Sequence, residues 1–223
     1  MFAASKGTNF IRNRVAVRAV ASQQNSANTS VLIIPRPVGA TAGDTLVVFA
    51  GSNTTSNNWV ASSVNWVEIV DGDNSAPAML AAYRVLSAGD AAITDFTFSS
   101  NAVSNARHGG SIIAVQDGTY YANSGLNSID ASNTTCTALT VQSNYNQTLM
   151  LSCFITSLAS AGAAFSTPTN MSAVASNSDV DAPTWGVFSQ YVGAANTGVR
   201  LSVAAGVPAA GQSEAITLLF KPN

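Results

Sequence analysis

Thr45-Leu46-Val47-Val48-Phe49-Ala50 is a short apolar run that directly follows the turn residues Gly43 and Asp44. A run of the same kind, Thr148-Leu149-Met150-Leu151-Ser152-Cys153, follows the turn residues 143–146 one half-chain later. Short continuous apolar runs bounded by turn residues are typical of buried strands. The two runs therefore predict two equivalent buried strands.

Three further pairs of segments keep the same order at nearly constant spacing; they are 76–80 with 182–186, 93–97 with 199–203, and 112–115 with 216–219. This recurrence predicts two copies of a four-strand unit, at about 31–116 and 137–221. It favours an all-β fold: a single jelly-roll-like β-sandwich over 31–221, preceded by an extended basic arm over 1–30. Two separate immunoglobulin-like sandwiches are the alternative, but each unit offers little more than four strands where such a domain uses about seven.

The composition is poor in charge. Apolar residues make up 47% of the chain and charged residues only 9%, against about 25% charged in an ordinary soluble domain. Neutral faces of this kind can pack on neighbours without desolvating charge. The net charge of −2 predicts no attraction to nucleic acid or to an anionic membrane. No run approaches the roughly 18 apolar residues of a spanning helix, so neither nucleic acid nor membrane is an expected partner.

The N-terminal segment is basic, because no Asp or Glu precedes Asp44. Four of the nine basic residues of the chain lie in it: Lys6, Arg12, Arg14 and Arg18. A basic segment on a slightly acidic body predicts an arm that docks on a partner, with a frayed terminus as the alternative. These four side chains are the candidate partner-binding residues.

The sequence contains no recognisable catalytic pattern. His108 is the only histidine and falls in a predicted Gly-rich turn, where we expect it to be exposed. No nucleophile elbow, phosphate-binding glycine loop or His-rich metal spacing occurs, and no pair of carboxylates suits glycoside hydrolysis. We predict a non-enzymatic protein without a cofactor; a carbohydrate-active enzyme on a jelly roll ranks last.

Two acidic loops precede matching strands. Asp71 and Asp73 lie before one, and Asp179 and Asp181 before the other. Alternate oxygen ligands on a loop can hold calcium, but neither loop has the complete spacing, and Asx turns explain the same residues. The four residues are weak calcium candidates, and no metal site is predicted.

Cys136 and Cys153 lie at equal distances from a predicted hairpin turn at 143–146. Directly opposed cysteines in an antiparallel pair can approach disulfide distance. A disulfide between the two is therefore one alternative. Free buried thiols are favoured, because two cysteines do not mark a disulfide scaffold. The three tryptophans, Trp59, Trp66 and Trp185, are open to a sugar-binding role, but core packing is the favoured interpretation.

A series of short segments, in a match that covers about 31–221, has a recognisable residue pattern and strand order. They are Ile33-Ile34-Pro35, Gly43-Asp44-Thr45-Leu46-Val47, Trp66, Tyr83-Arg84-Val85, Gly89-Asp90 and Phe96-Thr97-Phe98. In these segments the chain resembles β-sandwich domains of bacteriophage virion proteins, which occur as capsid decoration (cement) proteins and in tail or head fibres. Such proteins are non-enzymatic and assemble on a virion lattice, often as trimers or dimers.

The resemblance implies a structural protein localised in the virion. Its partners would be the major capsid protein or another virion protein, together with further copies of itself in a trimer or dimer. A decoration protein that binds the shell through its arm and neutral faces is the first expectation. The alternative is a tail or head fibre module that recognises host surface glycans through exposed loops such as 51–58, next to Trp59, and 157–168.

Overall fold

The computed structural model describes residues 14–25, 27–54, 59–61, 65–72, 77–100, 106–129, 135–157, 163–177, 183–205 and 212–223. These residues form β-strands and a single 3-10 turn, η1 (Ala88–Ala92), so the predicted all-β class is confirmed. Within the described ranges no helix is long and apolar enough to cross a membrane.

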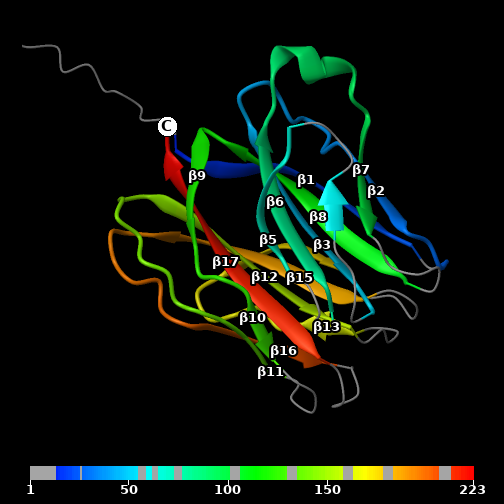
Figure 1. The fold of residues 1–223 in the computed structure, drawn as a ribbon. Helices are drawn as coiled ribbons and strands as arrows, with labels where there is room; N and C mark the ends of the chain where they lie inside the picture. The colour runs from blue at the N-terminus through cyan, green and yellow to red at the C-terminus, as the bar shows by residue number, and fades with distance from the viewer. Residues whose placement is uncertain are drawn as a thin grey trace, which may run out of the picture.

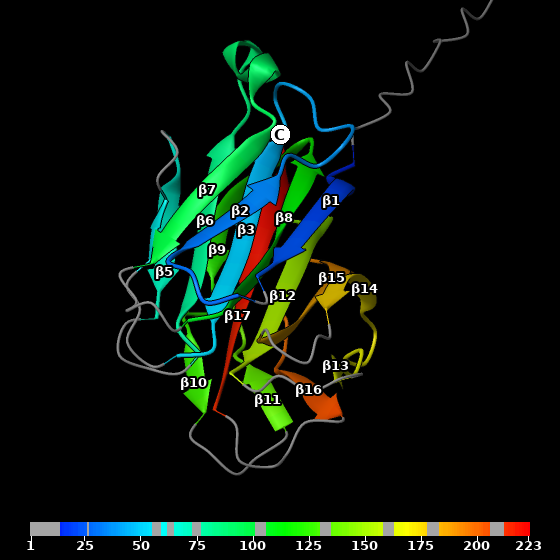
Figure 2. The same cartoon turned by 90° about the vertical axis from the view of Figure 1, so that its right-hand side faces the viewer.

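Two large antiparallel sheets make up most of the structure. The first has the order β1 (Ala16–Gln24), β8 (His108–Gln116), β3 (Thr45–Ser52), β6 (Met79–Val85), β5 (Val67–Asp71). The second has the order β10 (Asn127–Ile129), β17 (Ser213–Pro222), β12 (Thr148–Thr156), β15 (Thr184–Val192), β14 (Ser172–Asn177), and β9 (Gly118–Asn123) also pairs with β17. Figures 1 and 2 show β3 and β8 in one layer and β12 and β17 in the adjoining layer.

Two small antiparallel sheets cover the outer faces of the large ones. The first small sheet has the order β2 (Val31–Pro35), β7 (Asp95–Ser100), β4 (Trp59–Ala61), and the second has the order β11 (Thr135–Ala138), β16 (Arg200–Ala205), β13 (Ala164–Phe165). The described chain therefore stacks four sheets, where the sequence predicted the two of one sandwich.

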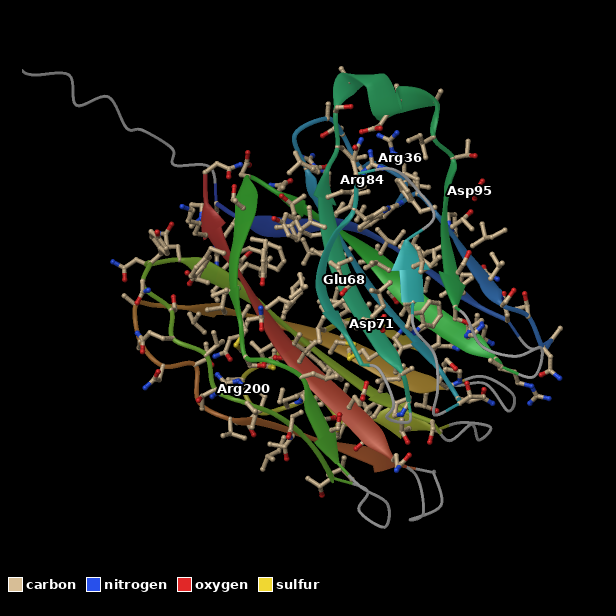
Figure 3. All side chains as sticks on the ribbon, viewed as in Figure 1. Arg36, Glu68, Asp71, Arg84, Asp95 and Arg200 are labelled. Carbon is tan, nitrogen blue, oxygen red and sulfur yellow. The ribbon has the colours of Figure 1, made fainter. Side chains whose placement is uncertain are left out.

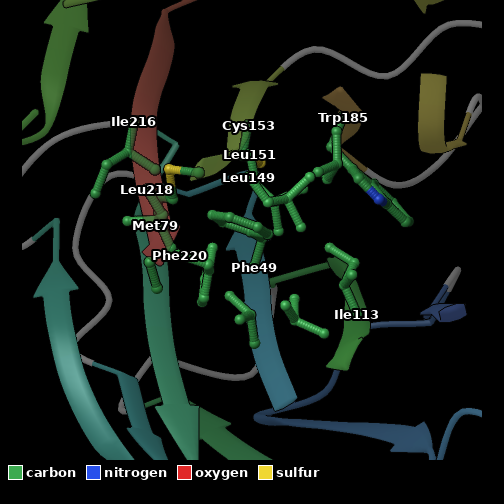
Figure 4. Packing of buried hydrophobic residues seen from close by; sticks show 14 of the residues in the cluster. Phe49, Met79, Ile113, Leu149, Leu151, Cys153, Trp185, Ile216, Leu218 and Phe220 are labelled. Carbon is green, nitrogen blue, oxygen red and sulfur yellow. The ribbon is translucent and has the colours of Figure 1, made fainter. Parts of the chain in front are cut away.

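The central core lies between the two large sheets and draws side chains from both (Figure 4). Val47 and Phe49 reach it from β3, and Leu149 and Leu151 from β12. The intervening residues point the other way, because successive side chains of a strand alternate between its two faces. Leu46 thus packs in a second cluster under the β2-β7-β4 sheet, and residues such as Met150 pack in a third under the β11-β16-β13 sheet.

The continuous apolar runs of β3 and β12 follow from this position. Every residue of both strands is buried, because each strand lies inside its sheet and is covered on both faces. β3 pairs with β6 and β8, and β12 pairs with β15 and β17. The two apolar runs at 45–50 and 148–153 are therefore inner strands of the two large sheets.

The predicted boundary of the N-terminal arm at residue 30 is wrong. Residues 16–24 form β1, which pairs with β8 from Ala16 opposite Gln116 to Gln24 opposite Gly109. The apolar side chains of residues 16–21 are partly buried against the two large-sheet cores. The backbone N–H and C=O groups of the polar residues that follow form hydrogen bonds with β8. The body consequently includes β1 and also Val15, which precedes β1 and is buried in the central core.

The predicted turn at His108 is also wrong, because β8 begins at this residue. The predicted connector over 117–135 contains β9 and β10. β14 is a further strand that the sequence did not indicate. β9, β10 and β14 are short or lie at sheet edges, where side chains are only partly buried and the sequence shows a weak hydrophobic pattern.

Candidate partner-binding surfaces

The predicted arm residues divide into two groups. Lys6 and Arg12 lie outside the described residues. The guanidinium carbon of Arg14 lies 3.6 Å from the centre of the Tyr191 ring. Arg18 Nε lies 2.9 Å from Asp44 Oδ2, and the Asp44 side chain is buried. Arg14 and Arg18 are exposed but make intramolecular contacts that hold residues 14–18 against the body.

Of the calcium candidates, Asp71 alone lies within the described residues; Asp73, Asp179 and Asp181 lie outside them. Asp71 ends β5, and its Oδ2 accepts a hydrogen bond of 2.9 Å from the backbone N–H of Trp59. In the described ranges, no three His, Cys, Asp or Glu side chains are grouped closely enough to hold a metal.

Cys136 and Cys153 are free and buried. The predicted hairpin between them is wrong, because Cys136 on β11 pairs with β16 while Cys153 on β12 pairs with β15 and β17. The two strands belong to different layers, so the cysteines are not partners in a ladder. Burial raises the pKa of the Cys136 thiol to about 12 and raises that of Cys153 as well, which keeps both thiols protonated and unreactive.

His108 is fully buried, contrary to the exposed position expected from the sequence. Its Nε2–H donates a hydrogen bond of 2.7 Å to the Thr29 carbonyl oxygen, and its ring meets the Trp59 ring edge-on at 4.9 Å. Burial lowers the pKa of His108. A neutral histidine that joins two segments of backbone has a structural role.

Trp185 is buried and Trp66 is partly buried, packed against the cluster under the β2-β7-β4 sheet, in keeping with the core packing expected of both. Trp185 is buried in the central core, and its Nε1–H donates to Ser111 Oγ at 2.9 Å. Trp66 packs edge-on against Phe96. Trp59 is 2% exposed, and its Nε1–H donates to the Ala78 carbonyl oxygen, so it cannot serve as an exposed glycan contact beside loop 51–58.

A buried ion pair that the sequence did not indicate lies beneath η1. Arg84 Nη2 and Asp90 Oδ1 are 2.7 Å apart, and the Arg84 side chain is 2% exposed. Arg36 donates to the Asp90 carbonyl oxygen at 2.7 Å, and Figure 3 shows Arg36 and Arg84 close together at this end. A hydrogen bond from the Ser87 backbone, helped by Arg84, lowers the pKa of Asp90. The pair anchors the loop that contains η1.

The outer side of the β11-β16-β13 sheet is apolar. We define the β16 face as the exposed aliphatic residues Leu139 (39%), Val199 (48%), Leu201 (55%) and Val203 (42%), with Thr135 and Thr137 beside them. No charged residue belongs to this described set, because Arg200 points to the opposite side of its strand and donates to Gln190 Oε1 at 2.8 Å. A hollow of about 230 Å³ at one end is lined by Thr169, Asn170, Val199, Arg200 and Leu201.

A second surface lies where the edges of the two large sheets meet, at the end of β1. We define the seam groove by two adjoining hollows of about 460 Å³ and 150 Å³ that share Gln23 and Gln24. The larger is further lined by Asn25, Ala27, Thr29, Val31 and Ile33, and the smaller by Ser22, Asn177 and Trp185. None of these lining residues is charged.

Comparison with models of known protein families, with curated proteins and with solved structures finds no match for this chain. The β16 face and the seam groove are therefore the two candidate functional sites. Neither surface could be located from the sequence, although the sequence predicts a strand at 199–203 and neutral faces on the surface as a whole.

Proposed function

We propose that this chain is a non-enzymatic structural protein of a bacteriophage virion, and most concretely a capsid decoration protein. In this proposal the β16 face binds the major capsid protein or another virion protein. The resemblance of 31–221 to virion β-sandwich domains and the low charge of the chain support it. Lys6 and Arg12, which precede β1, would add ionic contacts to the shell.

The β16 face is the observation that carries the proposal. Its four aliphatic side chains are between 39% and 55% exposed. Leu201 and Val203 lie on β16, Val199 directly precedes β16, and Leu139 directly follows the paired strand β11. Burying apolar area contributes about 25 cal/mol per Å². A neutral face can be buried on a partner without the cost of desolvating an ion. The adjoining hollow offers a place where one partner side chain can anchor.

The size of the face favours a multivalent partner. The strands β11, β16 and β13 have four, six and two residues. At about 3.3 Å per residue and a spacing of about 4.8 Å they cover roughly 200 Å², well below the roughly 800 Å² per partner of a standard interface. A single contact of this size is weak. Several copies on a repeating lattice, or a dimer or trimer of this chain, would strengthen it by avidity.

We also infer that the two halves of the chain are jelly-roll units of the same design. The order β8-β3-β6-β5 with β2-β7-β4 corresponds strand for strand to β17-β12-β15-β14 with β11-β16-β13, which supports this. In this arrangement the outer faces of the two small sheets are equivalent. The first also exposes aliphatic residues, Ile33 (50%) and Val60 (59%). Asp95 at the end of the first is exposed, whereas Arg200 at the end of the β16 face is partly buried and donates to Gln190, so the β16 face presents less charge to solvent.

Leu201→Lys is expected to weaken binding to empty capsids at least about tenfold, because the lysine charge would be buried in an apolar contact. The measurement is co-sedimentation with the shell over a range of protein concentrations. Val38→Lys is the matched control: Val38 is 94% exposed in a turn away from this face, and its variant should bind like the unchanged chain. Equal binding by both variants would contradict the proposal.

A further inference from the structure

The seam groove is lined by uncharged groups of two kinds. Amide side chains come from the end of β1 and the end of β14, and the aliphatic side chains of Val31 and Ile33 lie on the outer side. Its larger hollow, about 460 Å³, is within the range of about 300–1,000 Å³ for small-molecule sites. The groove can therefore hold a small ligand or one residue of a longer one.

Unused hydrogen-bonding groups point to a polar ligand. The Nδ2 amide of Asn177 is inaccessible to bulk solvent and has no hydrogen-bond partner among the described residues. A buried donor without a partner costs about 1–3 kcal/mol, a cost that a bound hydroxyl would remove once the Asn177 side chain turns its amide toward the groove. Gln23 and Asn25 donate through their side-chain nitrogens to the carbonyl oxygens of Gln24 and Val31, which leaves their side-chain oxygens as acceptors.

The groove has a rigid inner wall. Ser22 Oγ and Ser111 Oγ are 2.7 Å apart, and Trp185 Nε1–H donates to the same Ser111 Oγ at 2.9 Å. The Trp185 ring occupies the space beside Gly109, where a Cβ would lie 2.1 Å from the ring. This wall joins β1, β8 and β15 and orders the site before a ligand arrives, which reduces the entropy lost on binding.

The chemistry of the lining selects the ligand class. An anion would need an Arg or Lys partner, and none of the described residues that line the groove is charged. A purely apolar ligand would leave the Asn177 amide unpaired. Amides offer a donor and an acceptor side by side, which suits adjacent hydroxyl groups, and Val31 and Ile33 suit the C–H face of a sugar ring. We propose that the seam groove binds a neutral carbohydrate.

This inference is independent of the capsid proposal, because the groove and the β16 face share no residue. The test is saturation-transfer NMR with the full chain and a panel of glucose, galactose, mannose and N-acetylglucosamine, with sialic acid as the charged comparison. Transfer to at least one neutral sugar is expected, and little to sialic acid. No transfer to any neutral sugar would overturn the proposal.

Two variants locate the binding. Asn177→Ala removes an amide with no described partner and should weaken binding about tenfold with an unchanged melting temperature. Gln23→Ala should also weaken binding severalfold. Its control is Gln142→Ala, because Gln142 is likewise exposed and likewise donates through Nε2 to the next carbonyl oxygen. Transfer that persists at full strength in both groove variants would place the sugar elsewhere and contradict the assignment.

Discussion

Gly109→Ala is expected to lower the free energy of unfolding by about 3 kcal/mol. A Cβ at this position would lie 2.1 Å from Trp185 Cζ3 and 2.8 Å from Cη2. The ring is 1% exposed and is held by its hydrogen bond to Ser111, so it cannot move without disturbing the central core. Urea unfolding followed by circular dichroism measures the loss without relying on tryptophan fluorescence.

Gly89→Ala is the matched control for this substitution. The nearest atom to a Cβ at Gly89 is Ser87 Oγ at 3.6 Å, an ordinary contact. Alanine there should be neutral or stabilise by up to about 1 kcal/mol through the unfolded chain. The double variant Gly109→Ala/Trp185→Leu should be no less stable than Trp185→Leu alone, because the clash has been removed. Equal stability of the Gly109 and Gly89 variants would show that Trp185 does not pack against β8 as described.

Asp90→Asn is expected to cost about 3 kcal/mol of stability, because it leaves the Arg84 charge buried without its carboxylate. The folded state lowers the pKa of Asp90. Its contribution is therefore present above the ordinary Asp pKa of about 3.9 and is lost as the pH falls through the lower folded-state pKa. The stability difference between the unchanged chain and the variant should shrink in that acidic range.

Asp95→Asn serves as the comparison, because Asp95 is exposed and accepts a hydrogen bond from its neighbour Thr94. Its cost should stay within about 0.5 kcal/mol. Adding Arg84→Met to Asp90→Asn should recover part of the loss, since no charge then remains buried. If Asp90→Asn and Asp95→Asn destabilise equally, the ion pair does not anchor the η1 loop.

The inner strands could be predicted from the sequence, but the edges could not. β3 and β12 are buried on both faces, which imposes a continuous apolar run that stands out against turn residues. β1 and β14 lie at sheet edges, and their composition of small and polar residues resembles that of a linker. β1 and β14 are strands because they pair with β8 and β15, and such pairing depends on contacts between residues far apart in the sequence. The same limit explains why Cys136 and Cys153 were predicted to face each other across a hairpin.

The β16 face shows a second limit. Leu201 and Val203 alternate with Arg200 and Ser202, so the sequence indicates two faces of a strand. Alternation does not say which face is inside, because a shift of one residue exchanges them. Here Ser202 is buried and donates to the Ser166 carbonyl oxygen, while the aliphatic residues are exposed. A rule that places apolar side chains inside would predict that Leu201 and Val203 are buried, and the β16 face would not be found.

Electron cryomicroscopy of empty capsids decorated with the full chain tests the central proposal most directly. The orientation of the four-sheet stack on the shell can be read once β12 and β17 are resolved. We predict that Leu139, Val199, Leu201 and Val203 contact the capsid protein, with the β2-β7-β4 sheet turned away from that contact. Undecorated capsids, or a bound chain whose β16 face points to solvent, would contradict the proposed function.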